Sequence, residues 1–133
     1  MKLFSIPPEY LDKAWYEIQP YLERVVARDD RSTIWDILEK VYDNEWQLYT
    51  IADHKIYGIC ITSIEQYPLK KVLTVRFLSG DEMELWINLS ESLEQWAREI
   101  GCTEMDFVGR DGWRRYFKNS GWELKSISMV KKL

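Results

Sequence analysis

Apolar residues recur at helical spacing in the first quarter of the chain. Five of them would share one face of a helix: Leu11, Trp15, Ile18, Leu22 and Val25. Pro20 lies inside this pattern and removes a backbone donor, so the sequence predicts a kink or two short helices here. Residues 2–6 have the composition of a short strand, which Pro7 and Pro8 would stop.

A second helix is predicted after the polar link at residues 28–32. Thr33 and Asp36 have the spacing of a capping box, in which each side chain bonds the other residue's backbone amide. The apolar residues assigned to the packing face are Ile34, Trp35, Leu38, Val41 and Tyr42.

The pattern changes at Trp46 to runs that are rich in Ile, Val, Thr and Tyr. Residues 46–52, 56–67 and 71–78 form three such runs, separated by polar or proline-containing turns. This arrangement is typical of an antiparallel meander. The middle run begins apolar on both alternating faces, which indicates a central strand covered on both sides.

Helical spacing returns after residues 79–81, which we expect to end the third strand. The residues on the new helix face are Leu85, Leu89, Leu93, Trp96, Ala97 and Ile100. Gly101 is placed to cap this helix. A strand (102–108), a short helix (about 112–119) and a last strand (122–130) are expected to follow. The order predicts one domain over residues 1–133, a three-layer α/β or α+β fold with a mixed, mostly antiparallel sheet.

Composition is consistent with such a domain and excludes several classes of function. The chain has 133 residues, 46% hydrophobic and 30% charged, with a net charge of -4. It has no run of about 20 apolar residues and no signal-peptide pattern, so we expect no membrane span and a cytoplasmic location. Cys60 and Cys102 lie among apolar residues in the sequence, which favours reduced thiols in the core. The single histidine, His54, falls in a turn, which favours neither a zinc site nor a hydrolase triad.

Three stretches near the C-terminus carry a family resemblance. They are Leu93–Cys102 (LEQWAREIGC), Met105–Val108 (MDFV) and Tyr116–Trp122 (YFKNSGW). Together with the order of elements, they resemble the GNAT N-acetyltransferase superfamily, whose long helix ends in a Gly-Cys phrase and whose last helix precedes an aromatic-x-x-x-Gly-aromatic phrase. The stretch at 109–115 is similar to a divergent branch often encoded by phages and prophages.

The resemblance implies a transferase that uses acetyl-CoA. Two strands, here 71–78 and 102–108, would separate in mid-sheet to admit pantetheine. Amides of the turn at 79–82 and the following helix end would bind the pyrophosphate. The residues implied at the cofactor are Phe77, Leu78, Ser79, Gly80, Asp81, Arg110 and Phe117.

The sequence departs from the family at three places. The turn has one glycine, Gly80, followed by acidic residues that would repel a pyrophosphate unless they serve only as helix caps. Phe117 stands where the family often has the tyrosine that protonates the thiolate, which leaves the adjacent Tyr116 as candidate general acid. Arg110 replaces a common asparagine.

A general base would be needed to deprotonate an amine acceptor. The candidate is Glu104, with Asp106 on the same strand face and Glu65 on another strand, although exposure alone explains such carboxylates equally well.

Two functions from different classes therefore stay open. One is an acetyl-CoA-dependent N-acyltransferase with an unidentified amine acceptor. The other is a catalytically degenerate GNAT-fold protein of the phage-encoded kind that binds or assembles with a protein partner. A basic group at Arg110, Arg114, Arg115 and Lys118 offers a weaker third role in contacting nucleic acid, or is a solvated face. The acidic net charge argues against a general nucleic-acid coat, and no metal is implied.

The aromatic content bears on the choice between these two functions. Seven Trp and eight Tyr suggest a bulky core, an aromatic-lined cleft, or both. We expect Trp15, Trp35 and Trp96 to pack on buried helix faces. The remaining rings, which would surround the cofactor cleft and either line or plug it, are Phe77, Trp86, Trp113, Tyr116, Phe117 and Trp122.

Overall fold

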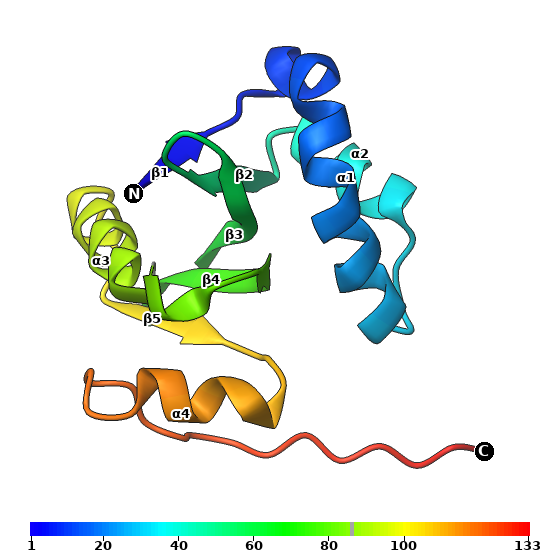
Figure 1. The fold of residues 1–133 in the computed structure, drawn as a ribbon. Helices are drawn as coiled ribbons and strands as arrows, with labels where there is room; N and C mark the ends of the chain where they lie inside the picture. Colours follow the sequence, from blue (N-terminus) through cyan, green and yellow to red (C-terminus); the bar gives the residue numbers. More distant parts are fainter. Residues whose placement is uncertain (86) are drawn as a thin grey trace.

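The computed structural model describes residues 1–85 and 87–133, and its centre is a five-stranded sheet (Figure 1). The strands, in spatial order β1-β2-β3-β4-β5, are Lys2–Ser5, Trp46–Ala52, Ile56–Gln66, Lys71–Gly80 and Glu104–Phe107. Neighbouring strands are antiparallel except β4 and β5, which are parallel. Helices α1 (Leu11–Arg28) and α2 (Ile34–Tyr42) cover one face, and α3 (Ser90–Glu99) covers the other. The predicted three-layer fold with a mixed, mostly antiparallel sheet is confirmed.

Helix α1 runs through Pro20 without a break, so the alternative of two short helices is wrong. Its buried side chains include Ile18, Leu22 and Val25, as the spacing predicts. Tertiary packing of this face outweighs the single backbone bond that the proline removes.

The capping box of α2 is present. The Thr33 amide donates to Asp36 Oδ2 at 2.8 Å, and the Asp36 amide donates to Thr33 Oγ1 at 3.3 Å. The predicted packing face is only partly right, because Trp35 is 77% exposed. The helix docks through Ile37, Leu38 and Val41, and a stripe of that width leaves Trp35 outside it.

Strand β3 has an apolar core on each side, as predicted for a central strand. Ile59 and Ile61 pack under α1 and α2, whereas Cys60 between them packs toward α3. Two of the predicted packing tryptophans are half-buried, with Trp15 against the first core and Trp96 against the second. The Trp96 ring lies 6.0 Å from that of Tyr49.

The boundary between β4 and α3 differs from the prediction. β4 continues to Gly80, and α3 begins only at Ser90, after two short 3₁₀ turns at Met83–Leu85 and Ile87–Leu89. Strand pairing of Ser79 and Gly80 with β3 extends β4, and Gly58 permits the close approach. The acidic residues Asp81, Glu82 and Glu84 therefore precede the helix rather than cap it. At the other end, Gly101 has a φ of 90° and caps α3 as predicted.

The last predicted strand, 122–130, is wrong. After a 3₁₀ turn at Asp111–Trp113 and α4 (Arg114–Phe117), Gly121 turns the chain with a φ of 88°. Residues 122–133 then continue as an extended segment that belongs to neither helix nor sheet. Alternating polarity predicts a strand only where a neighbouring strand supplies hydrogen-bond partners.

Candidate functional site

Strands β4 and β5 pair over only part of their length. Their register runs from Val72 opposite Glu104 to Val75 opposite Phe107. Beyond Val75, β4 continues to Gly80, and among the described residues it has a strand partner only on its β3 side. One edge of β4 is thus open from Arg76 onward.

A β-bulge in β4 coincides with the point where the two strands separate. Ile61 of β3 pairs with Phe77 and the next residue, Thr62, pairs with Val75, so Arg76 is the extra residue. Its guanidinium donates to Glu65 Oε1 at 2.7 Å and to Ser63 Oγ at 2.9 Å.

A small apolar cavity lies on the α3 side of the sheet, and Val75 and Phe107, the last pair before β4 and β5 separate, are among its lining residues. Its volume is about 40 Å³, enough for a few water molecules. Leu78 and Phe117, both predicted at the cofactor, line it, and Leu89 and Ser90 place the N-terminal end of α3 beside it. The other lining residues are Leu3, Ile51, Cys60, Leu93, Met105 and Trp122.

Aromatic rings pack against one another around this cavity. The Phe107 ring lies 6.0 Å from Trp113 and 5.8 Å from Phe117, and Phe117 lies 5.0 Å from Trp122. Trp113 is buried. Phe107, Phe117 and Trp122 all line the cavity. Phe77 lies on the opposite face of the sheet, 5.9 Å from Trp46, and the predicted Trp86 lies outside the described residues.

A second, polar cleft of about 400 Å³ lies between the turn after β4 and the α4 region. It brings together Gly80, Asp81, Arg110 and Tyr116 of the predicted site. Glu82 and Glu84 line one side and Arg115 the other, so both signs of charge face the cleft. The remaining predicted residue, Ser79, is buried, and its hydroxyl makes no hydrogen bond to another described residue.

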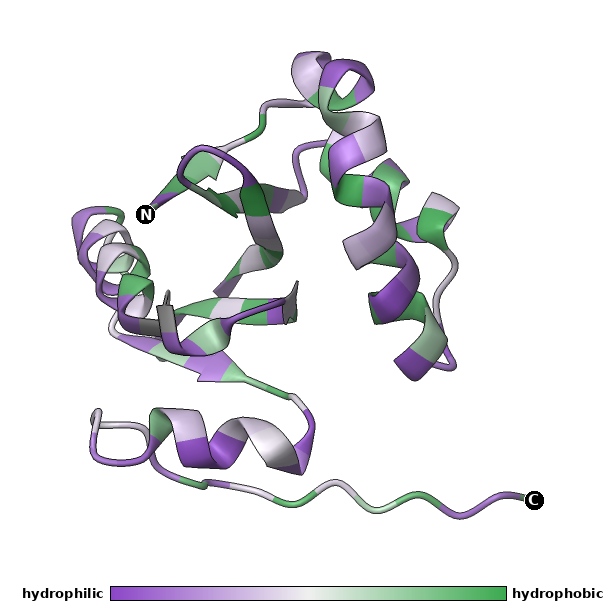
Figure 2. Ribbon diagram, in the orientation of Figure 1, coloured by the Kyte–Doolittle hydropathy of each residue, from purple (hydrophilic) through white to green (hydrophobic). Residues whose placement is uncertain are grey.

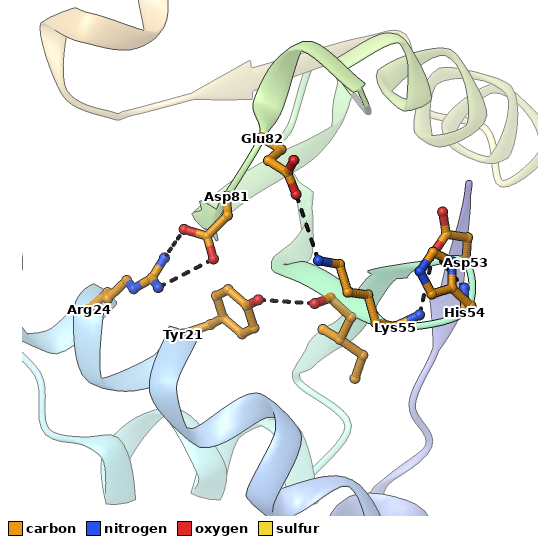
Figure 3. Close-up of polar contacts among 8 residues, drawn as sticks. Tyr21, Arg24, Asp53, His54, Lys55, Asp81 and Glu82 are labelled. Carbon is orange, nitrogen blue, oxygen red and sulfur yellow. Dashed lines mark hydrogen bonds and ion pairs between the residues drawn. The ribbon is translucent and has the colours of Figure 1, made fainter.

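The acidic turn is tied to the rest of the protein by two cations (Figure 3). Arg24 of α1 bonds Asp81 at 2.8 Å, and Lys55 of the β2–β3 hairpin lies 3.9 Å from Glu82. The hydrogen bond that Arg24 donates to Asp81 raises the pKa of the guanidinium. The Asp81 amide already donates to the Tyr57 carbonyl at 2.8 Å, so one of the turn amides predicted to bind phosphate is used within the fold.

The candidate acid and bases have different surroundings. Tyr116 is half-buried at the cleft, and its hydroxyl accepts a bond of 2.9 Å from Arg115. Glu104 begins β5 and pairs with Lys70, which lowers the pKa of the carboxyl. The pKa of Glu65 is lowered by hydrogen bonds from Ser63 and Arg76. A lowered pKa weakens a carboxylate as a base, and neither residue lines the cavity or the cleft.

Sequence reasoning missed two parts of this region. It did not identify Arg24 and Lys55 as partners of the turn, because ion pairs between distant elements leave no local pattern. It also missed Cys60 as a cavity residue, which the alternation along β3 could have indicated. Burial raises the pKa of the Cys60 thiol to about 12, so this cysteine stays neutral and is no nucleophile.

Comparison with known proteins identifies the fold. No protein-family model and no curated protein matches the sequence. Among solved structures, a probable acetyltransferase has 16% identity and a TM-score of 0.75, with 100% of this chain and 97% of that chain covered. A ribosomal-protein-alanine N-acetyltransferase from Brucella melitensis has 12% identity and a TM-score of 0.73, with 100% of both chains covered.

A third similar structure is glucosamine-6-phosphate N-acetyltransferase from Arabidopsis thaliana. It has 17% identity and a TM-score of 0.68, with 98% of this chain and 97% of that chain covered. Similarity at these identities concerns the fold, which is that of the GNAT acetyltransferases. No helix within residues 1–85 and 87–133 is long and apolar enough to cross a membrane.

Proposed function

We propose that this protein is an acyl-CoA-dependent N-acyltransferase that acts on an amine acceptor. The separation of β4 from β5 at the Arg76 bulge, over an apolar cavity, is the observation that carries the proposal. The open edge of β4 presents backbone donors and acceptors to which an extended, amide-containing arm can bond as an added strand. Acyl-CoA has such an arm, and its thioester supplies an activated acyl group.

The surroundings of the gap fit this cofactor in part. Leu78 and Val75 offer an apolar wall to the arm, and the N-terminal end of α3 at Ser90 favours phosphate charge. Arg110 and Arg115 add positive charge at the neighbouring cleft. The cavity of about 40 Å³ is smaller than the roughly 300 Å³ of ordinary ligand pockets, so Phe117 and Trp122 must move for the arm to enter.

Tyr116 is the proton donor in this proposal. Its hydroxyl lies at the cleft, where it can protonate a departing thiolate. The neighbouring Arg115 stabilises the phenolate that this transfer leaves behind. Glu104 remains a candidate base only if binding of the acceptor releases it from Lys70.

The acceptor is proposed only as an amine. The similar structures include acetyltransferases named for a protein alanine and for glucosamine-6-phosphate, which are chemically unlike each other. The stretch at 109–115 supports placing the chain in the phage and prophage branch, with a cytoplasmic location in the host.

A second function is favoured by the small volume of the cavity. If the rings of Phe117 and Trp122 do not move, the gap is part of the core and the protein is a degenerate GNAT-fold binding or assembly module. The acidic Asp81 and Glu82 at the cleft also favour this alternative.

Binding and transfer measurements distinguish the two functions. We expect native mass spectrometry to detect co-purified CoA and calorimetry to detect acetyl-CoA binding. Leu78→Phe should fill the cavity and weaken binding at least tenfold, whereas the control Leu69→Phe, at an exposed hairpin position, should not. Binding without acetyl transfer to a panel of amines would support the degenerate protein. No binding at millimolar acetyl-CoA contradicts the enzyme.

The role of Tyr116 has its own test. Tyr116→Phe should lower kcat by about 10²–10⁴-fold, the usual contribution of a general acid. Tyr16→Phe, on the exposed side of α1, is the matched control. An unchanged kcat would exclude Tyr116 as the acid.

A further inference from the structure

The part of the surface formed by residues 109–121 is basic and exposes no apolar side chain. It comprises the 3₁₀ turn, α4 and the turns on either side of them. Figure 2 shows hydrophilic residues along α4 and at both of its ends. Apart from glycines, the exposed residues are Arg110, Asp111, Arg114, Arg115, Lys118, Asn119 and Ser120. The four cations, Arg110, Arg114, Arg115 and Lys118, are called the basic surface below.

Most of this positive charge is not neutralised within the fold. Arg114 forms an ion pair with Asp111 at 3.0 Å. The other three cations of the basic surface form no ion pair with any of residues 1–85 and 87–133. Residues 110–133 carry seven basic and two acidic side chains, a formal charge of +5, which leaves -9 on residues 1–109. Positive charge is thus concentrated at one end of an acidic chain, which favours an anionic partner there.

Two arginines of the basic surface lie over aromatic rings. Arg110 Cζ is 5.9 Å from the centroid of the Trp113 ring, and Arg115 Cζ is 4.8 Å from that of Tyr116. Trp113 is buried, so its ring is a fixed support. A guanidinium that stacks on a ring keeps N–H groups at its edge for phosphate oxygens, and it loses less conformational freedom on binding.

The basic surface extends beyond the polar cleft. Arg110 and Arg115 line the cleft, whereas Arg114 and Lys118 do not. At 1.5 Å per helical residue, positions 110 to 118 span roughly 12 Å, which matches three or four phosphates of one nucleic-acid strand at about 3.4 Å each. A small ligand in the cleft would use only two of the four cations. A polyanion that follows the surface can use all of them.

The composition of this surface favours a nucleic acid over an acidic protein. A protein interface has an apolar core, and no exposed residue between 109 and 121 can supply one. Nucleic-acid backbones are instead contacted by Arg, Lys, Ser and Asn side chains and by backbone amides. Asn119 and Ser120 are exposed next to Lys118, and Gly109, Gly112 and Gly121 expose backbone without a side chain.

We propose that the basic surface binds the phosphate backbone of a nucleic acid. Contacts to phosphate carry no sequence information, so binding should be largely independent of base sequence. The acidic remainder of the chain restricts the contact to the α4 end of the molecule. This inference does not depend on the proposed enzymatic function.

Fluorescence anisotropy with labelled single-stranded RNA and duplex DNA of about 20 nucleotides tests the proposal. Both should bind at low salt, and the logarithm of the binding constant should fall linearly with the logarithm of the salt concentration. The expected slope is about -2.8 for the single strand and about -3.6 for the duplex, which is 0.7 or 0.9 for each of four phosphate contacts. Binding to neither probe at low salt overturns the proposal.

Variants outside the cleft locate the contact. Arg114→Gln with Lys118→Gln should weaken RNA binding about tenfold and reduce the slope to about -1.4, because two contacts are lost. Both side chains are exposed, so the melting temperature should stay the same. The control Arg28→Gln with Arg31→Gln removes the same charge from the exposed link after α1 and should keep the slope. An equal effect of the two variants, or an unchanged slope in the first, contradicts the proposal.

A competition experiment distinguishes a nucleic acid from an acidic protein. A polyglutamate peptide with the same charge as the RNA should compete only weakly, because its carboxylates lack the spacing of a phosphate backbone. Equal competition would show that any polyanion binds, an acidic protein included, and overturns the assignment to nucleic acid. NMR titration with the RNA should shift amide signals of residues 109–121, and shifts confined to other residues overturn the proposed location.

Discussion

Arg24 and Asp81 form a two-point ion pair that joins α1 to the turn after β4. The Nη1–Oδ1 distance is 2.8 Å and the Nη2–Oδ2 distance is 3.4 Å, across 57 residues of sequence (Figure 3). The sequence alone suggests that the acidic turn repels a pyrophosphate. The ion pair reduces that repulsion, because a guanidinium faces the Asp81 carboxylate.

Neutralising Asp81 should separate its structural effect from its effect on ligands. The pair is half-exposed, so Asp81→Asn should change the free energy of unfolding by less than about 1 kcal/mol. If acyl-CoA binds as proposed, loss of the negative charge should tighten binding about two- to fivefold, or roughly 0.4–1 kcal/mol, the range of exposed charge–charge interactions. Calorimetry with CoA measures this, and Glu9→Gln, at the opposite end of α1, controls for net charge. Weaker binding in Asp81→Asn would show that the ion pair positions the site.

Stability should depend on pH through Glu65. Hydrogen bonds from Ser63 and Arg76 lower the pKa of Glu65 below its ordinary value of 4.5. A carboxyl whose pKa is lower in the folded state stabilises the protein at pH values above its pKa in the unfolded state. This contribution is lost as the pH falls through the pKa of the folded state. Urea unfolding of Glu65→Gln should therefore show a deficit of the order of 1 kcal/mol at pH 7, which shrinks below about pH 4.5. A deficit that is constant between pH 7 and pH 3 would be inconsistent with this linkage.

Gly58 should not tolerate a side chain. A Cβ at this position would lie 2.5 Å from the Ser79 carbonyl oxygen and 2.9 Å from Gly80 Cα, both backbone atoms of β4. Gly58→Ala should destabilise the protein by about 1–3 kcal/mol, because β3 and β4 must move apart. Gly112→Ala is the matched control, since a Cβ there meets no atom within 4 Å. Equal melting temperatures for the two variants would show that the strands adjust without cost.

Substitution of the two apolar residues of α2 that differ most in burial should change the stability of the protein by different amounts. Ile37 is fully buried, so Ile37→Ala should cost about 2–5 kcal/mol. Trp35→Ala removes a larger side chain but one that is 77% exposed, and should change stability by no more than about 0.5 kcal/mol. Thermal unfolding followed by circular dichroism makes the comparison. A large loss in Trp35→Ala would indicate that a partner, such as a second copy, covers this ring.

Much of the secondary structure could be predicted because its signals are local. The Thr33–Asp36 capping box, the β2–β3–β4 meander and the Gly101 cap each depend on residues a few positions apart. The errors occur where local pattern and packing disagree. Trp35 fits a helical spacing but lies outside the face that docks. Residues 122–130 alternate like a strand, but no strand of residues 1–85 or 87–133 pairs with them.

The sequence by itself determined the order of elements and the fold class, since hydrophobic period and turn residues act over short distances. It also assigned Leu78, Phe117, Gly80, Asp81, Arg110 and Tyr116 to one region of the chain's surface. Only the tertiary structure decided that the first two line an apolar cavity and the others a polar cleft beside it. The gap between β4 and β5, the rings that line the cavity and the cations that pair with the acidic turn arise from contacts between distant segments, and no local pattern encodes such contacts.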